Sequence, residues 1–357
     1  MSKPHSHPPH PPHRAGAGRP TPVGLAGMGL VLLAFVAWGF WAWRTQGENG
    51  SRSAPKAGNV IAMGRSEMLK LGDVWGSRTG FLVWSSSMFG AHDLVRWEWP
   101  SGRLTRLTKH PHIDRAPKIS PDGRQVVFSR SRGDWASSRN RDEWDVWLLD
   151  LDTNEERRLV ERGSEPSWAS NGRSVVFQRG GRVVVQLDLQ TGSETVLLPE
   201  REDWIWETPS LDPAGEHVAV TVRGRRHRTS LFSLPGGKET RMGRGYQLNY
   251  APDGTWLVMV ESLRSEPNQV ARVDRDGNNK QFLIRLDAPW THLYFPRISN
   301  DGDFLVFGAS PDGGEYDRVR QEIFIWRIGD PPEDVARVSF HTGNDHGPDV
   351  WIHPGRY

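Results

Sequence analysis

Short stretches in which apolar and polar residues alternate recur along the chain from about residue 70 to its end. One of them, "RQVVFSR" at residues 124–130, sets Val126 and Phe128 among polar neighbours, which indicates a β-strand with a buried face. The preceding "PKISPDG" predicts a strand that ends in a tight turn. Residues 145–160, "DVWLLDLDTNEERRLV", predict two more strands around a turn. Residues 117–160 are therefore expected to form four antiparallel strands.

This four-strand unit is repeated along the chain. The glycine of its first turn aligns at Gly80, Gly123, Gly172, Gly215, Gly254 and Gly302, with spacings of 43, 49, 43, 39 and 48 residues. A period in the forties with strands inside each unit is typical of a propeller blade. Each turn is expected to place its glycine at positive φ, where a Cβ atom is penalised. We therefore predict an all-β, six-bladed β-propeller of four-stranded antiparallel blades over residues 60–357.

The end of the chain bears on how this ring would close. "WIHPGR" at residues 351–356 matches "WASNGR" at 168–173, which belongs to the first strand and turn of a blade. No further strands follow it. We expect this last strand to complete a blade that begins at the other end of the propeller. A seventh blade is the alternative, but it is short of sequence, because residues 60–74 are expected to hold one or two strands at most.

Three segments precede the propeller. Residues 1–22 are rich in proline and histidine, which predicts a disordered cytoplasmic tail, with a metal-binding tract as the alternative. Residues 23–43 carry no charge over 21 positions, enough for a transmembrane helix. Residues 44–59 are expected to be a flexible linker that contains glycine, serine and proline. Three tryptophans at one end of the apolar segment are expected to lie at the membrane interface: Trp38, Trp41 and Trp43.

The charges around the apolar segment predict its orientation. Basic residues without acidic ones precede it, so the N-terminus is expected in the cytoplasm and the propeller outside the cytoplasmic membrane of a bacterium. A cleaved signal peptide is the alternative, although the segment is long for one and no small-residue cleavage site follows it.

The repeated phrase P-x-W/I-S-P-D-G-R-x-x-x-F, followed by an Asp-rich turn and "RLV", resembles the repeat of TolB-type propellers. It is clearest at residues 117–128 and 166–177, and the resemblance covers nearly all of residues 70–357. The resemblance implies an extracytoplasmic platform for binding proteins. Similar repeats also occur in serine peptidases and in oligogalacturonate lyases. The predicted anchor, and the lack of room for an additional N-terminal α/β domain, depart from the soluble TolB pattern.

Composition narrows the classes of function. The chain has no cysteine, which excludes thiol catalysis, disulfides and cysteine-ligated metals. Its 45 Lys and Arg residues against 43 Asp and Glu residues give a net charge of +2, so no overall field favours nucleic acid as a partner. The 17 tryptophans are many, and tryptophan is enriched at contact surfaces.

Loops between second and third strands share one face of a propeller with the linkers between blades, and here they are long and irregular. We expect this face to bind protein subunits of a membrane complex, without catalysis and without a cofactor. The residues expected to contact partners are Trp135, Trp144, Trp204, Trp206, Arg223, Arg225, Arg226 and Arg228. The alternative is that the rings pack on neighbouring blades and the arginines are merely solvated.

An enzymatic function is the alternative to a scaffold. Histidines fall in blade linkers on the same predicted face, where they could surround a metal at the central channel. The resemblance to oligogalacturonate lyases implies that such a site would serve a metal-dependent polysaccharide lyase or hydrolase. The candidate metal ligands are His292, His341, Asp345 and His346.

Overall fold

The computed structural model describes residues 59–60, 63–224, 227–235, 237–261, 267–314, 319–341 and 343–355. The tail, the predicted transmembrane helix with Trp38, Trp41 and Trp43, and nearly all of the linker lie outside these residues, so they remain predictions. Within the described part of the chain, no helix has the length and apolar character needed to cross a membrane.

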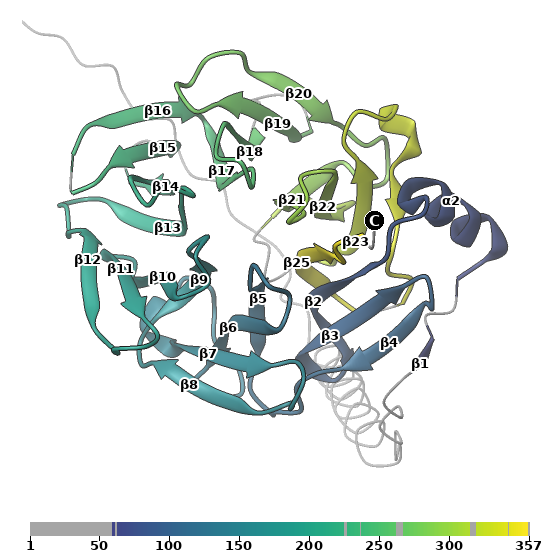
Figure 1. Ribbon diagram of the computed structural model, residues 1–357, viewed down its shortest axis with the longest axis horizontal. Coiled ribbons are helices and arrows are strands. Elements are labelled where there is room, and N and C mark those ends of the chain that lie inside the picture. Colours follow the sequence, from purple (N-terminus) through teal and green to yellow (C-terminus); the bar gives the residue numbers. More distant parts are fainter. Residues whose placement is uncertain are drawn as a thin grey trace, which may run out of the picture. The chain divides into compact units, whose positions relative to one another are not determined.

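The described strands form six antiparallel sheets, which Figure 1 shows arranged radially about a common centre. Five sheets consist of four consecutive strands each. Blade 2 consists of β5 (Asp114–Ile119), β6 (Gln125–Ser131), β7 (Trp144–Asp150) and β8 (Glu156–Val160). Blade 3 consists of β9 (Ser164–Trp168), β10 (Ser174–Arg179), β11 (Val183–Asp188) and β12 (Glu194–Leu198). Blade 4 consists of β13 (Ile205–Leu211), β14 (His217–Arg223), β15 (Arg228–Ser233) and β16 (Glu239–Gly243). Blade 5 consists of β17 (Gly245–Tyr250), β18 (Trp256–Glu261), β19 (Gln269–Asp274) and β20 (Gln281–Ile284). Blade 6 consists of β21 (His292–Ile298), β22 (Phe304–Ser310), β23 (Glu322–Arg327) and β24 (Ala336–Arg337). The predicted six-bladed propeller is confirmed.

Blade 1 combines both ends of the described chain. It contains β1 (Asn59–Val60), β2 (Gly80–Phe89), β3 (Ala91–Trp99), β4 (Arg103–Arg106) and β25 (Asp345–Ile352). The last strand, β25, pairs antiparallel with β2 and takes the innermost position, and each innermost strand contacts the next around the ring. The expected closure by the C-terminal strand is therefore confirmed.

The segment before β2 differs from the prediction. Instead of one or two strands, residues 60–74 contribute the end of the two-residue β1 and most of helix α2 (Arg65–Trp75). Leu71, Val74 and Trp75 are buried at helical spacing, and the Trp75 ring packs 5.4 Å from Phe304 of blade 6. The prediction of strands was wrong because the segment covers the seam between blades 6 and 1 as a helix.

The apolar core lies between the blades. Each of the six seams has its own cluster of buried side chains, for example Trp84 with Val306 between blades 1 and 6 and Phe81 with Phe128 between blades 1 and 2. Burial of apolar surface is the main stabilising contribution to folding. A blade removed from the ring would expose both of its faces, so the sheets stabilise one another only as a closed ring.

The first turn of the blades has the predicted glycine geometry, with one exception. Gly123 has φ +76°, and its N–H donates to the carbonyl of Ser120. The equivalent residues also have positive φ: Gly172, Gly215, Gly254 and Gly302. The prediction for Gly80 was wrong, because the first strand of its blade is β25. Gly80 therefore opens β2 after α2 and does not belong to a hairpin turn.

Every innermost strand carries an irregularity that the sequence pattern did not predict. One residue in each has positive φ, and the register with the second strand shifts beside it. These residues are Ala116, Glu165, Thr208, Gln247, Phe295 and Gly347. Proline follows five of the six, and proline disfavours the right-handed helical conformation of the preceding residue. Such bulges change the direction of side chains that line the channel.

Candidate functional site

The two faces of the propeller differ in their loops. We call the side with the glycine turns the turn face and the opposite side the loop face. On the loop face, residues 132–143, 224–227, 262–268 and 311–321 join second and third strands, whereas blade 3 has only residues 180–182 there. The predicted long loops on this face are therefore present in blades 2, 5 and 6, whereas blades 1, 3 and 4 have short connections there, at Gly90, residues 180–182 and residues 224–227.

Residues 132–143 of blade 2, which we call the strap, lie across blade 3 and reach blade 4. Arg141, in the 3₁₀ turn Arg141–Glu143, forms an ion pair with Glu207 of β13. A Cβ atom on Gly181 of the blade 3 hairpin would overlap the Arg141 side chain, and Gly181 has φ +70°. The short glycine hairpin of blade 3 therefore makes room for the strap.

Beneath the strap, the mouth of the channel holds a cavity of about 220 Å³. Its charged lining consists of three arginines and two glutamates: Arg139, Arg141, Arg223, Glu165 and Glu207. Glu207 pairs with two arginines: Arg223 Nε donates to Glu207 Oε2 at 3.2 Å, and Arg141 contacts Glu207 Oε1. Uncharged polar side chains and the rings of Tyr246 and Tyr294 complete the wall.

Deeper in the channel, polar side chains join neighbouring blades and leave little space. A second cavity, of about 20 Å³, is lined in part by Lys118 and Arg297. Asp349 of β25 accepts a hydrogen bond from the Ile119 N–H at 2.8 Å, and Arg297 lies 3.4 Å from the same carboxylate. Burial, with the nearby Arg297 charge, lowers the pKa of Lys118 to about 8. The roomier cavity at the mouth is thus the better candidate for binding.

Trp135 and Trp204 lie on the loop side of blades 2 and 4, as expected. Trp135, in the strap, is 65% exposed. Trp204 is half-buried, and the guanidinium groups of Arg201 and Arg228 lie 5.0 Å and 4.3 Å from the centre of its ring. The Trp204 ring is thus engaged within the protein, also by the Trp206 ring at 5.3 Å, and of these two residues Trp135 has the more exposed ring.

Trp144 and Trp206 correct the expectation of partner contact, because both belong to the core. Trp144 is 1% exposed, donates its indole N–H to the carbonyl of Ser137 and lies under the Arg115 guanidinium. Trp206 is 0% exposed. Of the predicted arginines, Arg223 lines the cavity and Arg228 pairs with Glu239, while Arg225 and Arg226 lie outside the described residues.

Two of the candidate metal ligands form a tight pair. His341 Nε2 lies 2.7 Å from Asp345 Oδ2, and His341 Nδ1 accepts a hydrogen bond from the Gly343 N–H at 2.8 Å. A zinc ion would need about 2 Å to each ligand atom, and the pair leaves no such gap. Both nitrogens of the ring are engaged within the protein.

The other two candidates lie elsewhere. The His346 ring is 4.8 Å from the ring of His92, and His292 Nδ1 lies 3.1 Å from the Thr291 hydroxyl. Burial lowers the pKa of His92 to about 4 and that of His346 well below its usual value. Among the described residues, none of the four belongs to a group of three donors close enough to share a metal ion.

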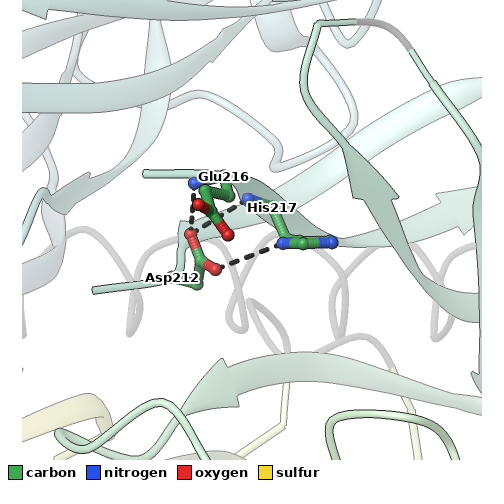
Figure 2. Close-up of side chains that lie close together, drawn as sticks. All are labelled: Asp212, Glu216 and His217. Carbon is green, nitrogen blue, oxygen red and sulfur yellow. Dashed lines mark hydrogen bonds and ion pairs between the residues drawn. The ribbon is translucent and has the colours of Figure 1, made fainter. Parts of the chain in front are cut away.

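The described residues do include one such group on the turn face: Asp212, Glu216 and His217 (Figure 2). Asp212 Oδ1 accepts hydrogen bonds from the backbone N–H groups of Glu216 and His217, at 2.7 and 2.9 Å. Arg275 lies 3.2 Å from Asp212 and 2.7 Å from His217 Nδ1. The guanidinium group already supplies the positive charge, so this cluster is an ion-pair network that fixes the turn.

Comparisons with known proteins agree with the propeller fold. The Tol-Pal system protein TolB of Francisella tularensis subsp. tularensis is 25% identical over 243 residues, which cover 53% of this chain and 52% of the relative. TolB from Acinetobacter baumannii superposes with a TM-score of 0.58 at 16% identity, over 79% of this chain and 68% of that one. A chain assigned as TolB from Agrobacterium tumefaciens gives a TM-score of 0.55 at 17% identity, over 77% and 97%.

The fold is a TolB-like six-bladed β-propeller. No family model matches the chain. The chain spans about half the length of the curated TolB relatives that it matches.

Sequence reasoning missed most of the cavity of this TolB-like propeller. Arg139, Arg141 and Glu207 line the cavity and lie close in sequence to the tryptophans predicted to bind partners, but they were not themselves predicted. One signal was present: Gly180-Gly181 predicts a minimal hairpin in blade 3 beside the long loop of blade 2. A long loop next to a very short one has room to cover it.

Proposed function

We propose that this chain is a non-catalytic protein-interaction subunit of a bacterial membrane complex. Residues 23–43 anchor it in the cytoplasmic membrane, and the TolB-like propeller, outside the cytoplasm, docks other subunits on its loop face. The similarity to TolB, a protein named for the Tol-Pal system, supports a role within a multi-component assembly.

The observation that carries this proposal is the exposed ring of Trp135. It is 65% exposed, whereas Trp144 at the end of the strap is buried and bonded to Ser137. The Arg141–Glu207 ion pair fixes the strap to blade 4. An indole presented from a loop that is held at both sides loses little entropy on binding, which is the property of an interface anchor.

Extraction of the full-length chain in mild detergent, followed by mass spectrometry of what accompanies it, tests the proposal. We expect stoichiometric partner proteins, and we expect Trp135→Ala to reduce their recovery about tenfold or more. The matched control is Phe282→Ala, since Phe282 is 54% exposed on β20 at the outer edge of blade 5. Recovery of a lone monomer in every mild detergent, or equal loss with both variants, would contradict the proposal.

A further inference from the structure

The strap of blade 2 and the end of β14 in blade 4, which are far apart in the sequence, bring arginines to the same cavity. The strap of blade 2 brings Arg139 and Arg141, and β14 of blade 4 ends in Arg223. They line one cavity because the blade 3 hairpin between them is too short to separate them. The chain thus gathers three guanidinium groups around about 220 Å³ of space.

Among the described residues of the lining, Arg141 and Arg223 share one carboxylate, that of Glu207. Glu165 forms an ion pair with the buried Arg115, whose Nη2 lies 3.3 Å from Glu165 Oε1. This leaves the single carboxylate of Glu207 opposite Arg141 and Arg223 together. Among the described residues, Arg223 pairs with Glu207 alone, and it does so through one nitrogen, Nε. Arg141 and Arg223 therefore have one carboxylate between them in the part of the chain that the structure describes.

The shape and the remaining groups of the cavity limit what could occupy it. The volume is below the 300–1,000 Å³ that is typical of sites for drug-sized ligands, so a small molecule fits better than a folded segment. The Tyr246 ring, stacked on His227 at 6.0 Å, gives one flat wall. Thr208, Thr221 and Gln247 also line the cavity and can hydrogen-bond to oxygen atoms of a ligand.

We infer that this cavity binds a small organic carboxylate, such as a di- or tricarboxylic acid, through Arg141 and Arg223. The flat fork of a guanidinium group matches a carboxylate in two parallel hydrogen bonds. Glu207 already sits between the two arginines as an internal carboxylate, and a ligand carboxylate competes with it for their donors. The site is separate from the exposed ring of Trp135, and it goes beyond the docking role proposed above.

Isothermal titration calorimetry of the purified full-length chain with citrate, succinate and inorganic phosphate as probes tests the inference. We expect citrate to bind with one-to-one stoichiometry and phosphate to bind at least tenfold more weakly. Arg223→Gln should weaken citrate binding about tenfold or more. Glu207→Gln should strengthen it, because it removes the competing internal charge. Both variants break the ion pair between Arg223 and Glu207. If the pair were only structural, both should affect citrate binding in the same direction, whereas direct binding of the ligand by Arg223 predicts opposite effects.

The matched control is Arg182→Gln. Arg182 also lies on the loop face, is paired with Glu200 at 2.9 Å and does not line the cavity, so its loss should leave citrate affinity unchanged. No binding of citrate or succinate at about 10 mM would overturn the inference, as would equal loss with Arg182→Gln or equal affinity for phosphate. Partner proteins are absent from this assay, so its failure would not bear on the docking role.

Discussion

The turn face and the loop face connect the same strands, but the connections on the turn face are alike and those on the loop face differ from blade to blade. On the turn face, Gly123 and its four equivalents repeat one hydrogen-bonded turn with φ between +65° and +83°. On the loop face, no two of the described loops of blades 2, 3 and 4 have the same length. The repeat therefore determines the fold, and the departures from the repeat determine what the propeller can bind.

The bonds between blades show the same contrast. On the turn side, Trp351 donates its indole N–H to the Pro121 carbonyl of the next blade, and Trp168 donates to the Lys118 carbonyl of the preceding one. On the loop side, the Arg141–Glu207 pair passes over a whole blade. Contacts between neighbours close the ring, whereas contacts that skip a blade create a cavity.

The largest expected effect comes from removing β25, since the ring then has no closing strand. Deletion of residues 345–357 exposes β2 and the seams on both sides of blade 1. We expect a loss comparable to the whole free energy of unfolding, more than about 5 kcal/mol, and no cooperative thermal transition by circular dichroism. Deletion of residues 354–357 alone, which leaves β25 intact, should keep the transition. A cooperative transition in the longer deletion would refute closure by β25.

We also expect acid to lower the stability of blade 1, the closing blade, because of His92 and His346. Their pKa values are lowered by burial, so the unfolded chain takes up protons near pH 6.5 while the folded chain does not. The free energy of unfolding should therefore fall as the pH drops from 6.5 to about 4, by on the order of 3 kcal/mol from His92. Urea denaturation at several pH values measures this.

Other groups around the pair bear on its titration. Asp345 favours the charged form of His92, and Arg115 disfavours that of His346. The raised pKa values of the buried Asp93 and Asp114 act in the opposite direction over the same range, so variants must isolate the histidines. His346→Gln should show a shallower loss of stability on acidification than the unmodified chain. An identical slope would exclude His346 as a source of the acid sensitivity.

On the turn face, a single methyl group should distinguish two glycines with the same backbone geometry. A Cβ atom on Gly123 would overlap the Trp351 ring, whereas one on Gly302 would meet nothing within 4 Å. We expect Gly123→Ala to lower the free energy of unfolding by about 3 kcal/mol and Gly302→Ala by about 1 kcal/mol. Chemical denaturation measures both. Equal losses would mean that backbone strain alone decides the effect and that the ring contact contributes nothing.

The fold could be predicted because its signals are local and repeated. Val126 and Phe128 alternate with polar residues, and an aspartate or asparagine precedes the turn glycine in most units. The predictions of a hairpin turn at Gly80 and of strands in place of α2 were wrong, because ring closure interrupts the repeat there. Leu71, Val74 and Trp75 have helical spacing in the sequence, which the prediction of strands did not take into account.

The candidate site could be predicted only in part, because it depends on packing between blades. Trp144 and Trp206 stand among charged residues in the sequence, yet neighbouring strands bury them. Arg141 and Glu207 are 66 positions apart and meet only after three blades have formed. The sharing of Glu207 by two arginines arises from this meeting, and a linear pattern cannot show it.

The smallest expected effect on stability is also the one that separates docking from packing on the loop face. Trp135→Ala should change the free energy of unfolding by less than about 0.5 kcal/mol, because the ring is 65% exposed. Trp144→Ala, in the same blade and 1% exposed, should cost about 3–5 kcal/mol. Thermal and chemical denaturation of the two variants measure the difference. If Trp135→Ala were as destabilising as Trp144→Ala, Trp135 would be a packing residue of the strap, and its ring would not be the anchor of an interface.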